Sequence, residues 1–408
     1  MNTKPTRKKW TRTEWLLLLA PLMIVIGLGA MNFAPQLQRA WREWREYGNN
    51  RPYAILRLQP YMNNQKVARF FDSFAFSPDG KSIVIAETTL ESWLGTFAPS
   101  PTHVHLWRIG TDLPVFSWES PLHPNSFVSQ IRYSDEKTVS IAGTLFKAPP
   151  TKVFYEEKRD TRNGRLISRQ SLKLSPKRDN PAGVESITPS NSSSPKFLER
   201  KKDGVSVKVS FSETAIQRPK NVKPYLVGKY VKVQFFAEVV DAKQRSKHRF
   251  ALTAFNDINI KNRSSFKSIG VAFSPDLRFL FVFMQDRDSR YGAAPPKVTV
   301  EVFDTRSRKS LWRQSYNENF VQAVAFSSRG LLAMSETRGG ITVGSNPTTW
   351  STRTELRSIQ TGQLLRVLQK EGINGLAALN NMQFSPDGKL LAVPQDDRLE
   401  LWDVSDLN

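Results

Sequence analysis

The sequence predicts an all-β fold built from one small unit of strands that recurs along the chain. Two near-identical segments carry this prediction, because FSPDGK occurs at residues 76–81 and again at 384–389. Each is followed downstream by a strand that contains tryptophan near its end, at residues 104–107 and 399–403. Repetition on this scale indicates that neighbouring units stack on one another and share a continuous core.

The repeated segment has the chemistry of a tight turn between two strands. Proline presets φ at about −65°, aspartate can accept a hydrogen bond from the backbone that follows, and glycine accepts a positive φ. A third copy of the turn joins expected strands at 271–273 and 279–283, and weaker copies occur at 131–137 and 325–330. Each unit is therefore expected to begin with a hairpin.

The spacing of the units predicts their number. Their aromatic markers lie at positions 76, 133, 273, 326 and 384, so successive markers are 57, 140, 53 and 58 residues apart. We expect the long interval to hold one degenerate unit, with strands at 205–211 and 230–236, which makes six units. Two compressed units in that interval would make seven, which is the alternative.

With these turns, strands and tryptophans in order, the chain resembles the WD-repeat β-propeller proteins. The last unit matches best, in residues 384–387, 396–397 and 399–403, and the first unit matches at 104–107. No unit begins with the Gly-His pair of that family, so the family's buried His-Ser-Trp-Asp network is incomplete in every unit. The resemblance implies a six-bladed β-propeller, or a seven-bladed one, that acts as a scaffold for protein–protein interaction.

A propeller must close on itself, and the sequence indicates how. The last unit stops at residues 403–404, one strand short, whereas residues 53–59 form a spare strand ahead of the first unit. This segment is similar to the expected fourth strands at 310–314 and 364–369. We therefore expect residues 53–59 to pair with the C-terminal strands, which removes two exposed sheet edges.

The N-terminus predicts a membrane anchor. Residues 15–34 carry no charge and match the about 20 apolar residues that cross a bilayer, so a transmembrane helix is expected there. A cleaved signal peptide is the alternative, although its apolar region is usually shorter. A basic cytoplasmic tail at 1–14 precedes the helix, an amphipathic juxtamembrane helix is expected at 35–50, and the propeller occupies 51–408.

Charges on the two sides of this helix predict its orientation. Five Lys or Arg residues precede the span and four follow it before residue 52, which favours a cytoplasmic N-terminus and an extracytoplasmic propeller. We therefore expect a single-pass protein of the cell membrane, in a bacterial envelope. A scaffold that faces the cytoplasm is the alternative.

Composition excludes several kinds of active site. The chain of 408 residues has no cysteine and four histidines, which removes disulfides, thiolate nucleophiles and cysteine-based metal sites. His103 and His105 alternate on one strand face, but without a further ligand nearby they are expected to be ordinary strand residues. The sequence contains no Gly-x-Ser-x-Gly motif, phosphate loop or dinucleotide fingerprint. We expect no catalytic residue, cofactor or metal, and hence no enzyme; the alternative is a ligand-binding or hydrolytic site in the central channel.

The loops between the second and third strands of the units are the expected binding surface. In a propeller these loops emerge on one face, and here they are long, at residues 87–102, 285–297 and 335–350. They carry or border aromatic and arginine residues of the types favoured at binding hot spots: Trp93, Phe97, Arg290, Tyr291, Trp350 and Arg353. The alternative is that the aromatic side chains pack back onto the scaffold.

The net charge of +22 indicates which partners to expect. Near a bilayer such a charge attracts anionic lipid or acidic wall polymer, which are candidate ligands besides a protein partner. Nucleic acid is not expected, because the basic residues are dispersed over the units instead of forming one stripe. The Ser, Pro and Asn content of residues 174–195 predicts a disordered insertion within the propeller.

Overall fold

The computed structural model describes eighteen stretches of the chain between residues 52 and 407. These are residues 52–57, 67–93, 96–99, 103–111, 113–119, 126–146, 152–173, 185–187, 197–217, 230–241, 246–252, 257–260, 269–285, 297–317, 319–338, 351–369, 382–394 and 398–407. The predicted basic tail at 1–14, transmembrane helix at 15–34 and juxtamembrane helix at 35–50 lie outside them and stay predictions. Within the described stretches, no helix has the length and apolar character needed to span a bilayer.

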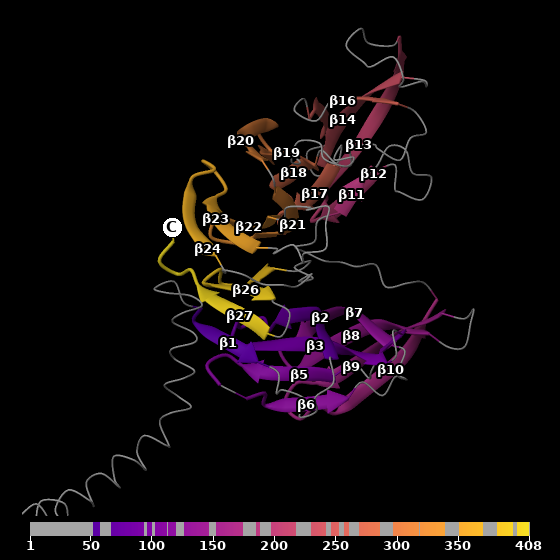
Figure 1. Ribbon diagram of the computed structural model, residues 1–408, viewed down its shortest axis with the longest axis vertical. Coiled ribbons are helices and arrows are strands. Elements are labelled where there is room, and N and C mark those ends of the chain that lie inside the picture. The colour runs from indigo at the N-terminus through magenta and orange to yellow at the C-terminus, as the bar shows by residue number, and fades with distance from the viewer. Residues whose placement is uncertain are drawn as a thin grey trace, which may run out of the picture. The chain divides into compact units, whose positions relative to one another are not determined.

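The described strands form six antiparallel sheets, which we number 1 to 6 in chain order of the hairpins that open them (Figure 1). Sheet 1 contains β2 (Val67–Phe76), β3 (Ser82–Trp93), β5 (His103–Arg108) and β6 (Phe116–Glu119), and β4 (Thr96–Pro99) pairs with the end of β3. Sheet 2 contains β7 (Ser126–Asp135), β8 (Thr138–Phe146), β9 (Lys152–Asp160) and β10 (Leu166–Leu172).

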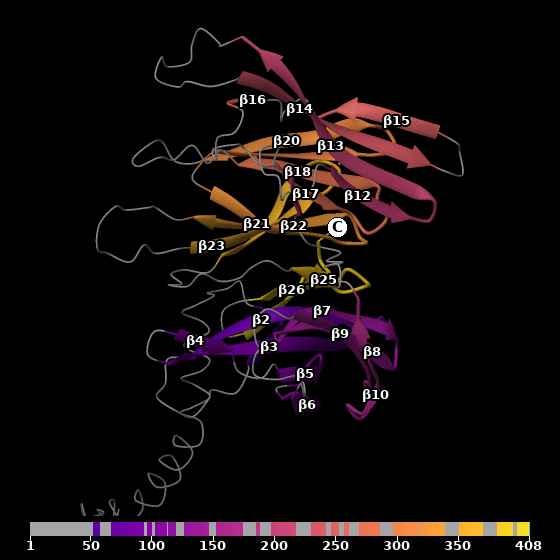
Figure 2. The same ribbon diagram turned by 90° about the vertical axis from the view of Figure 1, so that its right-hand side faces the viewer.

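Sheets 3 and 4 each carry one additional strand. Sheet 3 contains β12 (Phe197–Lys202), β13 (Val205–Ile216), β14 (Tyr230–Asp241) and β15 (Ser246–Ala251), and β16 (Asp257–Ile260) pairs with β14. Sheet 4 contains β17 (Ile269–Phe273), β18 (Phe279–Gln285), β19 (Lys297–Asp304) and β20 (Lys309–Asn317), and β11 (Glu185–Ile187) pairs with β17. Figure 2 shows the long strands β13 and β14 with β12 and β15 beside them.

Sheets 5 and 6 complete the set. Sheet 5 contains β21 (Asn319–Phe326), β22 (Leu331–Arg338), β23 (Ser351–Ser358) and β24 (Leu364–Gln369). Sheet 6 contains β25 (Gln383–Phe384), β26 (Leu390–Pro394), β27 (Arg398–Asp403) and β1 (Ala54–Arg57).

Six sheets of at least four strands agree with the six predicted units and fit a six-bladed β-propeller. Sheet 3 fills the long interval in which the sequence predicts one degenerate unit, and no sheet of the described residues supplies a seventh blade. Residues 185–187, within the segment predicted to be disordered, form β11, and the rest of 174–195 lies outside the described residues.

The predicted closing strand is confirmed. β1 pairs antiparallel with β27, with Ala54 opposite Leu401 and Arg57 opposite Arg398, and Figure 1 shows the two strands side by side. Leu56 is buried in a cluster with residues of sheets 1 and 6, because its side chain faces Trp107 and Leu399. The N-terminal strand thus completes the last sheet and covers the edge of β27.

One predicted loop is a hairpin instead. Within residues 87–102, β3 extends to Trp93 and β4 pairs antiparallel with its end, with Leu90 opposite Pro99 and Trp93 opposite Thr96. The segment contains threonine, tryptophan and phenylalanine, which favour strands, and the loop prediction did not use this signal.

Apolar clusters join neighbouring sheets. They connect sheet 1 with sheet 2, sheet 3 with sheet 4, sheet 4 with sheet 5, and sheet 6 with sheet 1. Between sheets 5 and 6, Arg366 donates a hydrogen bond of 2.9 Å to the backbone oxygen of Asp403. These contacts join sheet 3 to sheet 4, sheet 4 to sheet 5, sheet 5 to sheet 6, sheet 6 to sheet 1 and sheet 1 to sheet 2, in the circular order that a propeller has.

Candidate functional site

The structure describes the backbone of three of the six predicted binding residues. Trp93 lies at the end of β3 and Phe97 in β4, so both belong to the tip of one hairpin, where Ser92 is opposite Phe97. Arg353 lies near the start of β23, directly after the segment that contains Trp350. Arg290, Tyr291 and Trp350 lie outside the described residues, and their predicted roles stay predictions.

Arg353 belongs to a buried cluster of charges in sheet 5. Its Nη2 lies 2.6 Å from one carboxylate oxygen of Glu355, and Nη2 of Arg357 lies 2.7 Å from the other. The three side chains share one face because alternate residues of a strand point the same way. One carboxylate between two guanidinium groups is a charge-assisted arrangement that fixes all three side chains.

Sheet 4 contributes to the same cluster. The hydroxyl of Tyr316 in β20 donates a hydrogen bond of 3.1 Å to Glu355, and its ring lies under the guanidinium of Arg357. Burial, together with the charge of Glu355, raises the pKa of the Tyr316 hydroxyl, so Tyr316 stays a neutral donor. The cluster therefore ties β23 to the preceding sheet.

Arg353 is held in place and is partly exposed. Its side chain is 25% exposed, and its buried Nε has no hydrogen-bond partner among the described residues. A buried N–H is out of a partner's reach, so binding would use the exposed quarter of the side chain. The predicted residue that the structure describes best is thus fixed by Glu355 and accessible in part.

Glu355 has counterparts that sequence inspection missed. Glu157, Glu301 and Glu400 also lie three residues before the end of a third strand, and all are buried. Arg159 and Arg169 bind Glu157, and Arg398 donates to Glu400 at 3.1 Å. The signal was present in the sequence as a glutamate at a constant distance from each strand end.

Sheet 1 has histidine at this position. Nδ1 of His105 lies 2.8 Å from the hydroxyl of Ser117, and Nε2 lies 3.3 Å from a carboxylate oxygen of Glu87. His103 stacks beside His105, with ring centroids 6.3 Å apart. Within the described stretches, no group of three or more His, Asp or Glu side chains is placed to hold a metal ion.

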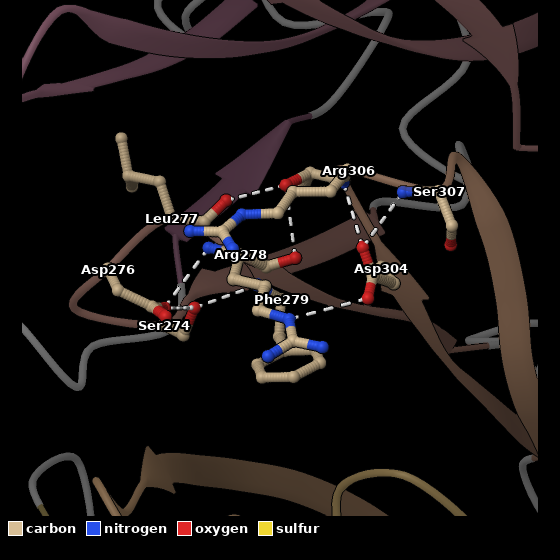
Figure 3. A network of polar contacts seen from close by, with 9 residues as sticks. Ser274, Asp276, Leu277, Arg278, Phe279, Asp304, Arg306 and Ser307 are labelled. Carbon is tan, nitrogen blue, oxygen red and sulfur yellow. Dashed lines mark hydrogen bonds and ion pairs between the residues drawn. The ribbon is translucent and has the colours of Figure 1, made fainter.

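The opposite ends of the strands carry polar turns that the sequence did predict. In sheet 4 the hydroxyl of Ser274 donates to Asp276 at 2.6 Å, and Asp276 accepts the backbone N–H of Arg278 (Figure 3). Asp304, at the end of β19, accepts the backbone N–H groups of Arg306 and Ser307 and lies 3.4 Å from Nε of Arg278. The turn between the first two strands is thus tied to the end of the third strand.

The twin turns of sheets 1 and 6 repeat this chemistry. Ser77 donates to Asp79 and Ser385 to Asp387, each at 2.6 Å. These hydroxyl groups are the main reason that the pKa of Asp79 and of Asp387 is lowered. Both aspartates are therefore ionised turn residues that hold backbone, and neither has the raised pKa of a general acid.

Comparison with known proteins gives no family. No family model matches the chain, and no curated protein matches it. Among solved structures, the periplasmic gluconolactonase of Pseudomonas aeruginosa is 13% identical, with a TM-score of 0.35 over 82% of this chain and 88% of that one.

Two further solved structures have similar values. The WD40 domain of SCAP from fission yeast is 9% identical, with a TM-score of 0.28 over 86% of this chain and 98% of that one. The GH93 α-L-arabinofuranosidase of Fusarium graminearum is 8% identical, with a TM-score of 0.34 over 87% and 99%. The fold assignment rests on the six sheets themselves.

Proposed function

We propose that this protein is a non-enzymatic scaffold, a WD-repeat-like propeller that binds a protein partner through the loops between second and third strands. The observation that carries the proposal is Arg353, which Glu355 holds in place while a quarter of its side chain remains exposed. A fixed, partly exposed cation three residues after Trp350 in the sequence is the kind of preorganised anchor that binding surfaces use.

The hydrolytic alternative has less support. General acid–base catalysis needs a carboxyl group that reaches substrate. Glu157, Glu355 and Glu400 are instead buried and bound to arginine side chains, and Glu301, whose pKa is raised by burial, is buried too. Their chemistry favours a role in holding sheets together, which suits a scaffold.

The proposal includes the membrane anchor. The uncharged segment at 15–34 would cross the membrane once, with the N-terminus in the cytoplasm and the propeller outside it. In that setting the partner is an envelope protein, and anionic lipid or wall polymer is a secondary ligand attracted by the net charge of +22.

One experiment tests partner, surface and orientation together. A photo-crosslinking residue is placed at position 93, 291 or 350 of the full chain, and at exposed Lys81 or Lys389 in the turns as matched controls. Irradiation of intact spheroplasts should give discrete protein adducts from the three loop positions alone, and protease added outside should digest them.

Alanine variants of the same positions complete the experiment. Trp93→Ala, Tyr291→Ala and Trp350→Ala should lose the adduct made from a neighbouring loop position while the melting temperature stays unchanged. A lower melting temperature with no adduct would mean that the aromatics pack on the scaffold, and adducts from all positions alike would contradict a specific surface. Adducts that protease reaches only after lysis would overturn the orientation.

A further inference from the structure

Sheet 3 has one face that packs on sheet 4 and one that takes part in none of the apolar clusters of the described residues. Val207, Val209 and Phe235 point to sheet 4 and belong to the cluster that joins the two sheets. Alternate residues form the other face, which we call the outer face of sheet 3. The described apolar clusters contain no residue of this outer face within the part of the chain that the structure covers.

The outer face of sheet 3 is strongly basic. The strand register places five cationic side chains on it: Lys201, Lys208, Lys232, Lys247 and Arg249. Two acidic side chains, Glu199 and Glu238, lie between them. Glu199, Lys208, Glu238 and Arg249 are directly opposite one another across four strands, so charges alternate along this row.

Two cations on this face are stacked on aromatic rings. Nζ of Lys208 lies 4.1 Å from the ring centroid of Phe197, and the guanidinium carbon of Arg249 lies 3.9 Å from that of Phe236. Cation–π contact and apolar support hold these charges close to the sheet. The surface therefore presents apolar and cationic groups side by side in a fixed pattern.

The strand position of Glu238 is buried in other sheets. Glu238 lies three residues before the end of its third strand, as Glu157, Glu355 and Glu400 do, but those three are buried. On the outer face of sheet 3 the side chains of Lys201 and Lys247 are 71% and 67% exposed, and Phe197 is 46% exposed. A position that other sheets bury against a neighbour is here left open and charged.

Direct packing of sheet 2 on this face is disfavoured by charge. The face of sheet 2 turned away from sheet 1 carries Arg132, whose side chain is 56% exposed, and Lys158 opposite Ser140. Glu156 on the same face is already bound by Ser140, Arg132 and Gln170. Two faces that both present cations repel each other, whereas an acidic segment would be attracted to either.

We propose that the outer face of sheet 3 binds an acidic polypeptide segment of a partner protein. Charge complementarity requires an acidic ligand, because cations outnumber acids by five to two on this face. A uniform polyanion fits less well, because each of its charges would meet Glu199 or Glu238 as often as a cation in the alternating row. A polypeptide can place apolar side chains on Phe197 and Phe236 and its carboxylates between the acids.

The test uses the full chain in detergent micelles and a fluorescent peptide of about 12 residues in which Glu and Leu alternate. The variant combines Lys201→Gln, Lys208→Gln and Lys247→Gln, and the matched control combines Lys81→Gln, Lys309→Gln and Lys389→Gln at exposed positions of other sheets. Fluorescence anisotropy should show peptide binding about ten-fold weaker in the sheet 3 variant, because three exposed pairs are lost. The control should stay within about two-fold of the parent.

Three outcomes would overturn the proposal. Equal affinity in variant and control would show that the outer face is not the site. Tighter binding of polyphosphate than of the peptide, with the same loss in the variant, would assign the face to polyanions. No peptide binding by the parent, with a lower melting temperature of the variant, would mean that sheet 2 covers the face. Because these lysines belong to sheet 3, whereas the loops of the proposed function join strands of sheets 1, 4 and 5, either proposal can fail without the other.

Discussion

Sheets 4 and 5 differ in the side chains that surround the buried glutamate near the end of their third strand. In sheet 5, Glu355 lies between Arg353 and Arg357, and the ion pairs satisfy both carboxylate oxygens. In sheet 4 the equivalent Glu301 has Phe303 two residues later, where sheet 5 has Arg357. Oε2 of Glu301 has no hydrogen-bond partner among the described residues, and burial raises the pKa of this carboxyl.

The turns between the first and second strands also differ, because sheet 4 again has a large apolar residue where sheet 5 does not. Gly330 in sheet 5 adopts a φ of 83°, which glycine accepts without strain, whereas sheet 4 has Leu277 at the equivalent place with a φ of 58°. Leu277 is buried in the cluster that joins sheets 3 and 4, and Phe303 belongs to that cluster too. Both sheets thus have a positive φ at this turn position. Sheet 4 holds a leucine there by apolar packing, whereas sheet 5 has a glycine there and ion pairs in its third strand.

The largest expected change in stability comes from the replacement of an arginine in sheet 5. Arg357→Met should destabilise the protein by about 3 kcal/mol, because Glu355 is left with one guanidinium partner in a buried site. The substitution also removes the hydrogen bond of 2.6 Å from Arg357 to the backbone oxygen of Gly362. Urea unfolding followed by circular dichroism measures the change.

The matched control is Arg278→Met in sheet 4. Arg278 is 39% exposed and lies 3.4 Å from Asp304, so its loss should cost less than about 1 kcal/mol. Equal effects of the two substitutions would show that the buried cluster of sheet 5 stabilises no more than a surface pair.

An intermediate effect is expected from the turn of sheet 4. Leu277→Gly should destabilise by about 2 kcal/mol, because the loss of a buried leucine outweighs the relief of about 1 kcal/mol of backbone strain. Gly330→Ala should cost about 1 kcal/mol through backbone strain alone. Its added Cβ would meet no atom within 4 Å. Comparison of the two urea midpoints checks the order, and a Leu277→Gly protein more stable than its parent would show that strain dominates.

Much of this fold could be predicted from the sequence because its signals are local. The FSPDGK turns, the strands that flank them and the spare strand predicted at 53–59 each depend on a few neighbouring residues. The turns and flanking strands are present, and the spare strand is described as β1 at Ala54–Arg57. The hairpin of β3 and β4 was missed because a strand extension and a long loop can have similar composition.

The candidate site was less predictable for a physical reason. Arg353 could be chosen by residue type, but its ion pair with Glu355 and the contribution of Tyr316 depend on how sheet 5 meets sheet 4. The basic residues of sheet 3 looked dispersed in the sequence, because strand register alone brings Lys201, Lys208 and Lys247 to one face. Contacts between distant strands carry no local signal.

The smallest expected effect concerns Glu301 and depends on pH. Burial raises the pKa of Glu301 above its usual value, only partly offset by a hydrogen bond from Ser310 and by the charge of Arg313, so ionisation is harder in the folded state than in the unfolded chain. The folded protein should therefore lose stability as pH rises from the unfolded pKa, about 4.3, through the raised folded pKa, and the penalty persists at pH 7. Glu301→Gln should be as stable as its parent near pH 4 and more stable at pH 7, by less than about 1 kcal/mol, because the amide carries no charge to bury.

Thermal melts of both proteins from pH 4 to 7 measure the difference. Glu355→Gln serves as the contrast, because removal of its charge leaves two arginines unpaired and should destabilise the protein. A Glu301→Gln protein that is less stable than its parent at pH 7 would show that Arg313 compensates the carboxylate, and that the two sheets differ less than their contacts indicate.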